Sequence, residues 1–187
     1  MASLRDQRAG PLSGRSFSVH GFSIIPAPDA ARFVFRTRGV AVDTAGRAFG
    51  VDLPRQVLRT SATSARTAAW IGPDEWLLLG PESEKALIEQ QLTEALTGIA
   101  HSLVDVSHRD PAIALSGARA AAALNTGCPL DLHPFVFTVG MCARTLLGKA
   151  QIILWRTGPQ LFHVQPSRSF ADYVWRFLEQ AGRDVDN

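Results

Sequence analysis

The segment CPLDLHP, residues 128–134, brings a thiol, a carboxylate and an imidazole close together in the sequence. In such a group Cys128 could be a nucleophile, His133 its general base and Asp131 the acid that orients the base. The two prolines and the alternating leucines of the same segment instead favour a rigid turn whose leucines pack inward. We therefore interpret the segment as structural and expect no catalytic residue in it.

Two other short strings match catalytic motifs only in part. HRD at 108–110 occurs in the kinase catalytic loop, but Pro111 follows it and no glycine-rich nucleotide loop precedes it. Gly-Lys at 148–149 occurs at the end of a phosphate-binding loop, but that loop needs a glycine where Ala143 stands and a Ser or Thr after the lysine. The sequence also has no G-x-S-x-G string, so neither phosphate binding nor this type of hydrolase is indicated.

The histidines and cysteines do not form a metal-binding pattern. The five histidines include no H-x-x-x-H or H-E-x-x-H pair, which would place two imidazoles on one helix face. Cys128 and Cys142 are too few for a disulfide framework or a cysteine-rich zinc site. We expect both to be buried thiols, and we expect no metal-binding and no cofactor-binding residue in this chain.

Composition and charge indicate an ordinary globular protein. Of 187 residues, 46% are apolar and 19% are charged, which argues against disorder. The net charge is only +2 and the basic residues form no stripe, so nucleic-acid binding is not supported. No apolar run is long enough for a membrane helix or for the centre of a signal peptide, and we expect a cytoplasmic protein with no membrane partner.

Arginines in the second half of the chain could serve a partner protein. Their planar guanidinium groups can hold a carboxylate or meet acidic residues of another chain, although a solvated face explains any one of them equally well. The five positions are Arg109, Arg119, Arg144, Arg156 and Arg168. Many arginines, aromatic residues and no catalytic group together are typical of an obligate subunit.

The apolar periodicity of the first half predicts a strand, a hairpin and a helix. RFVFRTR at 32–38 partly alternates apolar and polar residues, as a half-buried strand does. AWIGPDEWLLL at 69–79 predicts a β-hairpin that turns at 72–75, because Gly and Pro interrupt two apolar runs. Residues 82–97 have the apolar spacing of an amphipathic helix. Residues 1–16 show neither period and predict a flexible arm, with order beginning near Phe17.

The second half repeats this order of elements. We expect a strand pair over 104–107 and 112–116, followed by a helix over 118–126. A long strand over 143–155 should then turn at 157–160 into a strand over 161–165. The last expected element is a helix that begins with a capping box at 169–172.

Two tryptophan-containing hairpins show that the halves are copies. At an offset of 86 residues Pro73 falls on Pro159 and Trp76 on Phe162, and the apolar positions of the two helices also coincide. Upstream, at an offset near 80, the strand at 33–35 falls on 113–115. We therefore predict an α+β fold made of two strand-helix-strand-strand-helix units, over residues 17–100 and 101–187. The expected structural anchors, which fix each hairpin against the helix of its own copy, are Trp70, Pro73, Trp76, Trp155, Pro159 and Phe162.

Five strings together resemble the gamma subunit family of bacterial heterotetrameric sarcosine oxidases. They are WIGPDEWLLL at 70–79, DVSHR at 105–109, GCPLDL at 127–132, CARTLLGKAQIILWR at 142–156 and RSFADYVW at 168–175. The resemblance extends over about residues 17–181. It implies a shortened form of the folate-binding aminomethyltransferase fold of the glycine cleavage T-protein, which contains ferredoxin-like units.

The resemblance also implies a function. In such oxidases the alpha and beta subunits hold FAD, FMN and NAD, the alpha subunit carries the tetrahydrofolate-binding domain, and the small delta subunit holds zinc. The complex demethylates sarcosine to glycine, forming hydrogen peroxide and, with tetrahydrofolate, methylenetetrahydrofolate. We expect this chain to be a structural, non-catalytic subunit that docks onto the larger flavoprotein chains.

Two alternatives stay open. The first is a stand-alone folate-binding protein or aminomethyltransferase that uses a pocket between the two halves. Against it, GKAQ at 148–151 lacks the cysteine of the K-G-C-Y-x-G-Q-E signature found in folate-dependent iron-sulfur maintenance proteins, and no segment aligns with the catalytic aspartate region of the T-protein. The second is a four-subunit oxidase that acts on another N-methyl amine.

Overall fold

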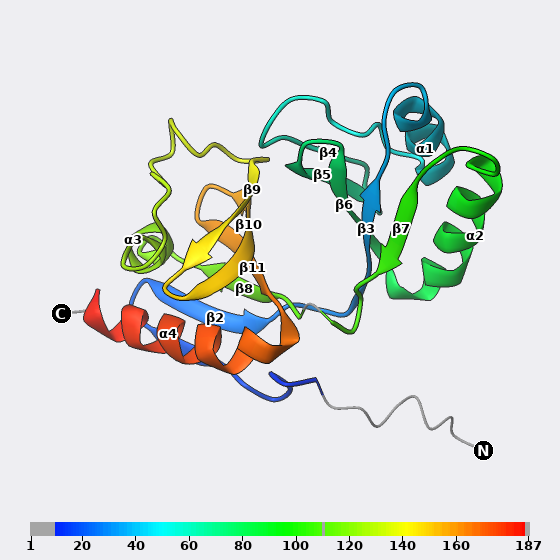
Figure 1. Cartoon of the computed structure of the whole chain (residues 1–187). Helices are drawn as coiled ribbons and strands as arrows, with labels where there is room; N and C mark the ends of the chain where they lie inside the picture. The colour runs from blue at the N-terminus through cyan, green and yellow to red at the C-terminus, as the bar shows by residue number, and fades with distance from the viewer. Residues whose placement is uncertain (1–9, 110, 186–187) are drawn as a thin grey trace, which may run out of the picture.

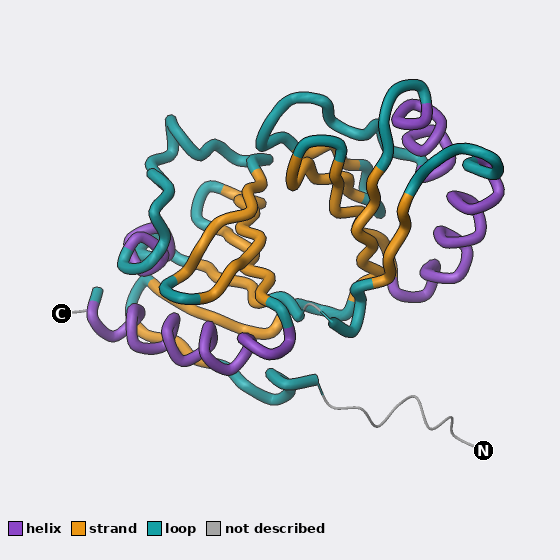
Figure 2. The backbone as a smooth tube through the Cα atoms, viewed as in Figure 1, coloured by secondary structure: helices purple, strands orange, loops and turns teal. Residues whose placement is uncertain are grey.

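Strands with alternating apolar residues pair into two antiparallel sheets (Figure 1). The computed structural model describes residues 10–109 and 111–185. Each sheet buries one face under two helices, and the other two faces are turned toward each other. Figure 2 shows the helices on the outside and the strands on the inside of this α/β/β/α arrangement.

The first sheet is built mainly from the first half of the chain. Its strand order is β4-β5-β6-β3-β7. The strands are β3 (Ala30–Arg36), β4 (Thr60–Ala62), β5 (Thr67–Gly72), β6 (Glu75–Pro81) and β7 (Ser102–Asp105), and the helices are α1 (Ala41–Phe49), the 3-10 turn η1 (Glu82–Glu84) and α2 (Lys85–Ala95). Phe33 and Phe35 of β3 are fully buried on the helix side, in one cluster with Phe49 of α1 and Leu92 of α2. The two-residue period of the strand thus supplies the apolar face that the helices cover.

The second sheet has the strand order β1-β2-β8-β11-β10-β9. The strands are β1 (Phe17–Val19), β2 (Phe22–Pro26), β8 (Ile113–Ser116), β9 (Cys142–Leu147), β10 (Ala150–Gly158) and β11 (Leu161–Pro166), and the helices are α3 (Ala120–Asn125), the 3-10 turn η2 (Arg168–Phe170) and α4 (Ala171–Asp184). Leu154 and Val164 pack under Trp175 and Leu178 of α4 in the second core. The amphipathic spacing of α4 therefore gives it an apolar face that packs on the second sheet, as the spacing of α2 does on the first.

The repeated order of elements is present in the structure. The series β5-β6-β3 in one sheet corresponds to β10-β11-β8 in the other, and each hairpin is followed by a 3-10 turn and a helix. The expected hairpins at 69–79 and around 157–160, and the helices over 82–97 and 118–126, are confirmed.

The two halves exchange their outer strands, and this corrects the boundary expected at residue 100. Strand β2 hydrogen-bonds to β8 in the second sheet and buries Phe22 and Ile24 in the second core. Strand β7 pairs with β3 in the first sheet. Residues 104–107 and 112–116 are therefore not a strand pair, because β7 and β8 belong to different sheets.

Three local expectations are also corrected. The long strand over 143–155 is a hairpin, β9 and β10, because Gly148 turns the chain at a φ of +56°. No side-chain cap begins α4, which instead continues a 3-10 turn. Order begins before Phe17, because Leu12 is 2% exposed in the second core and Arg15 pairs with Asp172 at 2.7 Å. Residues 1–9 of the expected arm lie outside the described residues.

Within the described ranges, no helix has both the length and the apolar content needed to cross a membrane.

Candidate functional site

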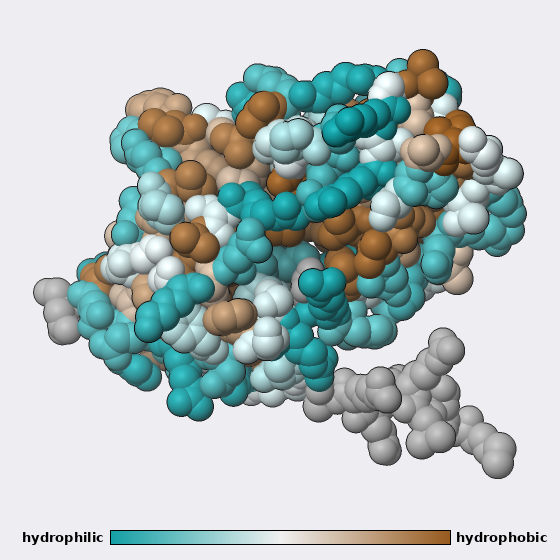
Figure 3. Space-filling model, viewed as in Figure 1, coloured by the Kyte–Doolittle hydropathy of each residue, from teal (hydrophilic) through white to brown (hydrophobic). Residues whose placement is uncertain are grey.

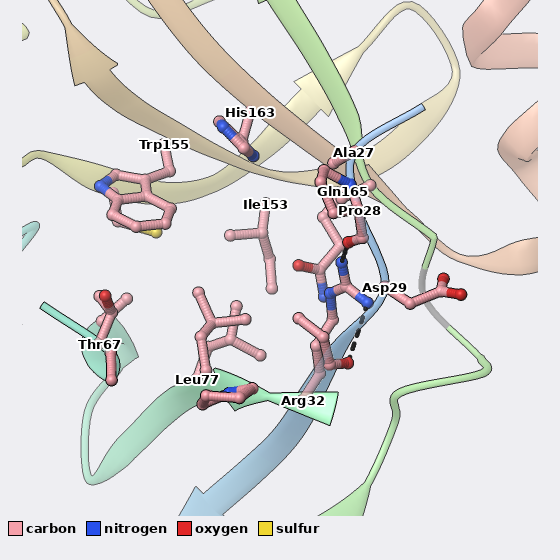
Figure 4. A pocket seen from close by; sticks show the side chains of 18 of the residues that line it. Ala27, Pro28, Asp29, Arg32, Thr67, Leu77, Ile153, Trp155, His163 and Gln165 are labelled. Atoms are coloured by element: carbon pink, nitrogen blue, oxygen red, sulfur yellow. Dashed lines mark hydrogen bonds between the residues drawn. The ribbon is translucent and has the colours of Figure 1, made fainter. Parts of the chain in front are cut away.

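The facing surfaces of the two sheets enclose a cavity of about 720 Å³. Side chains that alternate away from the helices form its walls: Arg32 and Leu77 from the first sheet, Ile153 and Trp155 from the second (Figure 4). Figure 3 shows apolar residues in the hollow between the two halves. A mostly apolar cavity with a few polar groups is the usual form of a small-molecule site, so this is the candidate functional site.

Backbone hydrogen bonds join the two sheets along one side of the cavity. The Thr60 amide donates to the Gly140 carbonyl at 3.1 Å, and the Cys142 amide donates to the Leu58 carbonyl at 3.0 Å. Next to this seam Ala69 and Leu77 pack with Cys142 in a small apolar cluster. The seam fixes the spacing of the sheets and hence the width of the cavity.

An ion-pair network adds a second link between the sheets. Glu75 of β6, whose side chain is 7% exposed, binds Arg144 of β9 at 2.7 Å and Arg36 of β3 at 2.9 Å. Burial alone would raise the pKa of Glu75, but the hydrogen bonds and charges of Arg144 and Arg36 outweigh it and lower the pKa below 4.5. Glu75 is therefore ionised at neutral pH and ties the first sheet to the second.

The polar side chains of the cavity lie on both walls. Arg32, 5% exposed, donates to the carbonyls of Ala30 at 3.3 Å and Pro28 at 3.4 Å. Gln165 and the indole of Trp155 extend from the opposite wall (Figure 4). Among the described residues, Gln165 Nε2 and Trp155 Nε1 are buried donors without a hydrogen-bond partner.

His163 is a neutral imidazole in this site. Its ring lies 5.7 Å from that of Trp155. Burial lowers its pKa from 6.5, and the positive charge of Arg32 lowers it further. At neutral pH the wall of the cavity therefore carries the positive charge of Arg32 and no second cation from His163.

Cys142, at the cavity wall, is not an activated nucleophile. Burial raises the pKa of its thiol to about 12, and the charge of Arg144 offsets only part of this. The thiolate, which is the nucleophile, is then a very small fraction at neutral pH. The described residues also contain no cluster of three or more His, Cys, Asp or Glu that could hold a metal ion. The arrangement is suited to binding through hydrogen bonds and apolar contact.

The thiol, carboxylate and imidazole of segment 128–134 do not come together. Cys128 is buried in the second core, while Asp131 and His133 are exposed on the loop after α3. The Asp131 carboxylate accepts the backbone N–H of His133 at 2.8 Å, which closes a local turn. Leu132 is fully buried and Leu130 packs at the edge of the core, so the turn interpretation is correct.

The six expected anchors differ in position. Trp76 and Phe162 are buried on the helix faces of their own sheets. Trp70 is partly buried and packs beside Trp76. Pro73 and Pro159 are exposed at the hairpin turns. Trp155 does not anchor its hairpin against a helix. In the first hairpin Trp70 is paired with Trp76, and in the second the residue paired with Phe162 is Arg156. Arg156 therefore corresponds to Trp70. Trp155 lies one position earlier in its strand, so its side chain is on the opposite face of the sheet and faces the cavity.

Arg156 is a structural residue that the sequence did not single out for this role. It is 3% exposed and donates to the carbonyls of Phe137 at 2.8 Å and Leu132 at 3.2 Å. It thereby holds the loop between α3 and β9. A charged residue within an apolar strand was the available signal, and the same signal marks Arg32. Gln165 is an uncharged polar residue within an apolar strand, which is a weaker signal of the same kind.

Comparison with known proteins identifies the family. Residues 30–184 match the sarcosine oxidase, gamma subunit family. The chain belongs to this family. It is 36% identical over 135 residues to the sarcosine oxidase subunit gamma of an Arthrobacter species and to that of Corynebacterium sp. strain P-1, an alignment that covers 72% of this chain and 66% of each relative.

Solved structures agree with the family assignment. A chain of the heterotetrameric sarcosine oxidase of Corynebacterium sp. U-96, solved in complex with pyrrole 2-carboxylate, superimposes with a TM-score of 0.83 at 28% identity, over 89% of this chain and 86% of that one. The glycine cleavage aminomethyltransferase T of Bartonella henselae matches with a TM-score of 0.66 at 12% identity, over 88% of this chain and 50% of that one. The second likeness shows a shared fold, as the sequence resemblance implied.

Proposed function

We propose that this chain is the gamma subunit of a heterotetrameric sarcosine oxidase and that its role in the complex is structural. The observation that carries the proposal is the family match over residues 30–184, together with the likeness to a chain of a heterotetrameric enzyme. The complex would demethylate sarcosine oxidatively to glycine, with hydrogen peroxide and methylenetetrahydrofolate as further products.

The chemistry of the cavity supports a non-catalytic role. The thiol of Cys142 is protonated, His163 is neutral, and Asp29, the only carboxylate among the described residues that line the cavity, is exposed at its edge. The loop after α3 exposes Phe135, Val136 and Val139, of which Phe135 is 89% exposed. Exposed apolar groups of this kind are typical of a surface that contacts another subunit.

The partners and cofactors follow from the same proposal. Alpha, beta and delta subunits would surround this chain, with FAD, FMN, NAD, zinc and tetrahydrofolate bound in those partners. We also propose that each half is a ferredoxin-like unit, which the strand orders β5-β6-β3-β7 and β10-β11-β8-β2 support. The cytoplasmic location stays a prediction.

Assembly and activity test the proposal together. Co-expression with the alpha, beta and delta subunits of a heterotetrameric sarcosine oxidase, followed by affinity purification through a tag on this chain, should recover the flavin-containing chains in equal molar amounts. The recovered complex should form hydrogen peroxide from sarcosine, and this chain alone should form none. Peroxide formation by this chain alone would contradict the structural role.

A stand-alone folate-binding protein is the second candidate, favoured by the inter-sheet cavity and by the fold shared with an aminomethyltransferase. Calorimetric titration of the purified chain with tetrahydrofolate separates the two candidates. Micromolar binding by the chain alone favours the second one, and its absence favours the structural subunit. Assays of the assembled complex with other N-methyl amines decide whether sarcosine is the preferred substrate.

A further inference from the structure

The loop between α3 and β9 holds an aromatic side chain in solvent on an ordered backbone. Phe135 is 89% exposed, more than any other exposed large apolar residue of the described chain. Leu132 and Phe137, on either side of it, are buried in the second core. The backbone N–H groups of Val136 and Phe137 both donate to the His133 carbonyl at 2.9 Å, which closes a turn around Phe135. The neighbours of Phe135 therefore fix its ring in solvent.

Arg156 holds this loop from beneath. Its guanidinium is 3% exposed and donates to the carbonyls of Leu132 at 3.2 Å and Phe137 at 2.8 Å, one on each side of the exposed ring. The ring of His133 lies 5.4 Å from that of Phe135. A side chain that is already held in one conformation loses little freedom when a partner buries it, so more of its burial energy contributes to affinity. Aromatic residues are enriched in the cores of protein interfaces.

The apolar surface around Phe135 is small and projects from the molecule. Val136 and Val139 of the same loop are 54% and 50% exposed. Figure 1 shows the loop extending away from the second sheet beyond α3, and Figure 3 shows apolar residues at that corner. One phenylalanine and two valines supply roughly half of the 800 Å² per partner that a stable interface buries. A projecting anchor of this size is fully buried only in a pocket of another chain.

The charge around the loop favours an acidic partner. Arg59 donates to Thr138 Oγ1 at 3.2 Å, and Arg156 lies beneath the same loop. Neither guanidinium forms an ion pair with a carboxylate of the described residues. The one acidic residue between α3 and β9, Asp131, lies at the start of the loop and accepts a local backbone N–H. A second copy of this chain would bring the same positive charge, whereas a carboxylate would complement it.

We propose that Phe135 is the anchor by which this chain docks on another chain of the oxidase, in an apolar pocket with a carboxylate at its rim. The ring fills the pocket, Val136 and Val139 pack at its edge, and Arg59 pairs with the carboxylate. Docking of this kind rests on the proposed function, because it requires assembly with the other oxidase subunits.

Competition during assembly tests the anchor. The parent chain and a variant are co-expressed in equal excess with the alpha, beta and delta subunits, and the complex is recovered through a tag on the alpha subunit. Mass spectrometry then gives the ratio of variant to parent in the complex. Phe135→Ser should be at least about tenfold under-represented, because it loses the ring that fills the pocket.

Val40→Ser is the matched control for the ring. Val40 is 82% exposed before α1, in the other half of the chain, so Val40→Ser should enter the complex as often as the parent. Circular dichroism should show that both variants are folded, since both positions are exposed. Incorporation of folded Phe135→Ser at the level of the parent overturns the proposal.

A second pair of variants tests the acidic rim. Arg59→Glu should be under-represented by about tenfold, because it places a negative charge against the carboxylate of the partner. Arg47→Glu is its control, since Arg47 also donates to a threonine, Thr44, at 3.3 Å and forms no ion pair with the described residues. It should enter the complex like the parent. Equal incorporation of folded Arg59→Glu overturns the acidic rim.

The parent chain separates failure of the anchor from failure of the proposed function. If the parent does not enter the complex at all, the proposed function is wrong and the docking falls with it. If the parent and Phe135→Ser enter equally, only the anchor is wrong. Analytical ultracentrifugation of the isolated chain tests self-association through the same loop. We expect a monomer, and a dimer that Phe135→Ser dissociates would assign the loop to a second copy and overturn the proposal.

Discussion

At the residue scale, the role of each tryptophan depends on the face of the strand it occupies. Trp76 is 3% exposed under the helices and donates its indole N–H to the Pro54 carbonyl at 2.8 Å. Trp155 lies on the opposite face of its sheet and lines the cavity. The repeated string located both hairpins but did not show this difference, because a shift of one residue moves a side chain to the other face.

Truncating these two tryptophans should therefore have unequal effects on the free energy of unfolding. Trp76→Ala leaves a void in the first core and an unpaired Pro54 carbonyl, so we expect a loss of about 3–5 kcal/mol. Trp155→Ala enlarges a cavity that already exists, so we expect a loss below about 2 kcal/mol. Urea unfolding followed by circular dichroism measures both, and a larger loss for Trp155→Ala would show that our assignment of the anchors is wrong.

The two thiols should be inert in the folded chain. Cys142 has a pKa of about 12 and both cysteines are buried. At pH 8 iodoacetamide should modify neither thiol in native protein and both in urea, as measured by mass spectrometry. Rapid alkylation of native Cys142 would mean that the cavity wall is open to solvent and its thiol activated.

At the element scale, the link between the sheets rests on Glu75, and its effect on stability depends on pH. The folded-state pKa of Glu75 is lowered, so the carboxylate stabilises the fold above its unfolded pKa, near 4.5. This stabilisation is lost as the pH falls through the folded-state pKa. The link is therefore fully present at pH 7 and absent in strong acid.

Glu75→Gln should lower the free energy of unfolding by about 1–3 kcal/mol at pH 7, because Arg36 and Arg144 lose a common ionised partner. As the pH falls below 4.5 and through the lowered folded-state pKa of Glu75, the variant and the parent should converge. Asp74→Asn is the control, since Asp74 pairs with Arg38 on the exposed turn and should contribute less than about 1 kcal/mol. Urea unfolding across this pH range checks the prediction, and parallel stability curves for parent and E75Q would contradict it.

The exchange of outer strands depends on contacts that are distant in the sequence. A Cβ atom at Gly182 of α4 would lie 2.5 Å from Cδ1 of Phe22, so the helix needs a glycine where β2 packs. Alanine is favoured in helices by about 1 kcal/mol, yet Gly182→Ala should destabilise the chain by about 1–3 kcal/mol. Gln180→Ala, on the exposed face of α4, should change stability by less than about 0.5 kcal/mol. Thermal unfolding of both variants measures these changes in stability. Stabilisation by Gly182→Ala would contradict the packing of β2 on α4.

Local sequence patterns predicted the positions of helices and strands better than they predicted which strands pair with each other. The Gly-Pro turns at 72–73 and 158–159 and the apolar period of 85–95 are local, so the hairpins and helices could be placed from the sequence. The pairing of β2 with β8 is not local, because a short strand with alternating residues fits either sheet. The same holds for the cavity, since Arg32 and Gln165 meet only after two sheets have packed.

At the scale of the whole molecule, the repeated order of elements explains how the two sheets and their helices are arranged. Each copy buries one sheet face under its helices, and the remaining faces cover each other, with a seam of hydrogen bonds along β4 and β9. Most of the distinctive side chains, including Trp76, Phe162 and Arg156, serve these contacts. A rigid body with exposed apolar residues on one loop is suited to a subunit that supports catalytic partners.

Reconstitution with and without this chain tests the central claim most directly. The alpha, beta and delta chains would be co-expressed in both conditions and studied by size-exclusion chromatography with light scattering and by sarcosine-dependent peroxide formation. We predict a heterotetramer with full activity when this chain is present, and incomplete or unstable assemblies with reduced activity when it is absent. An assembly of the other three chains that is equally stable and equally active without it would contradict the account.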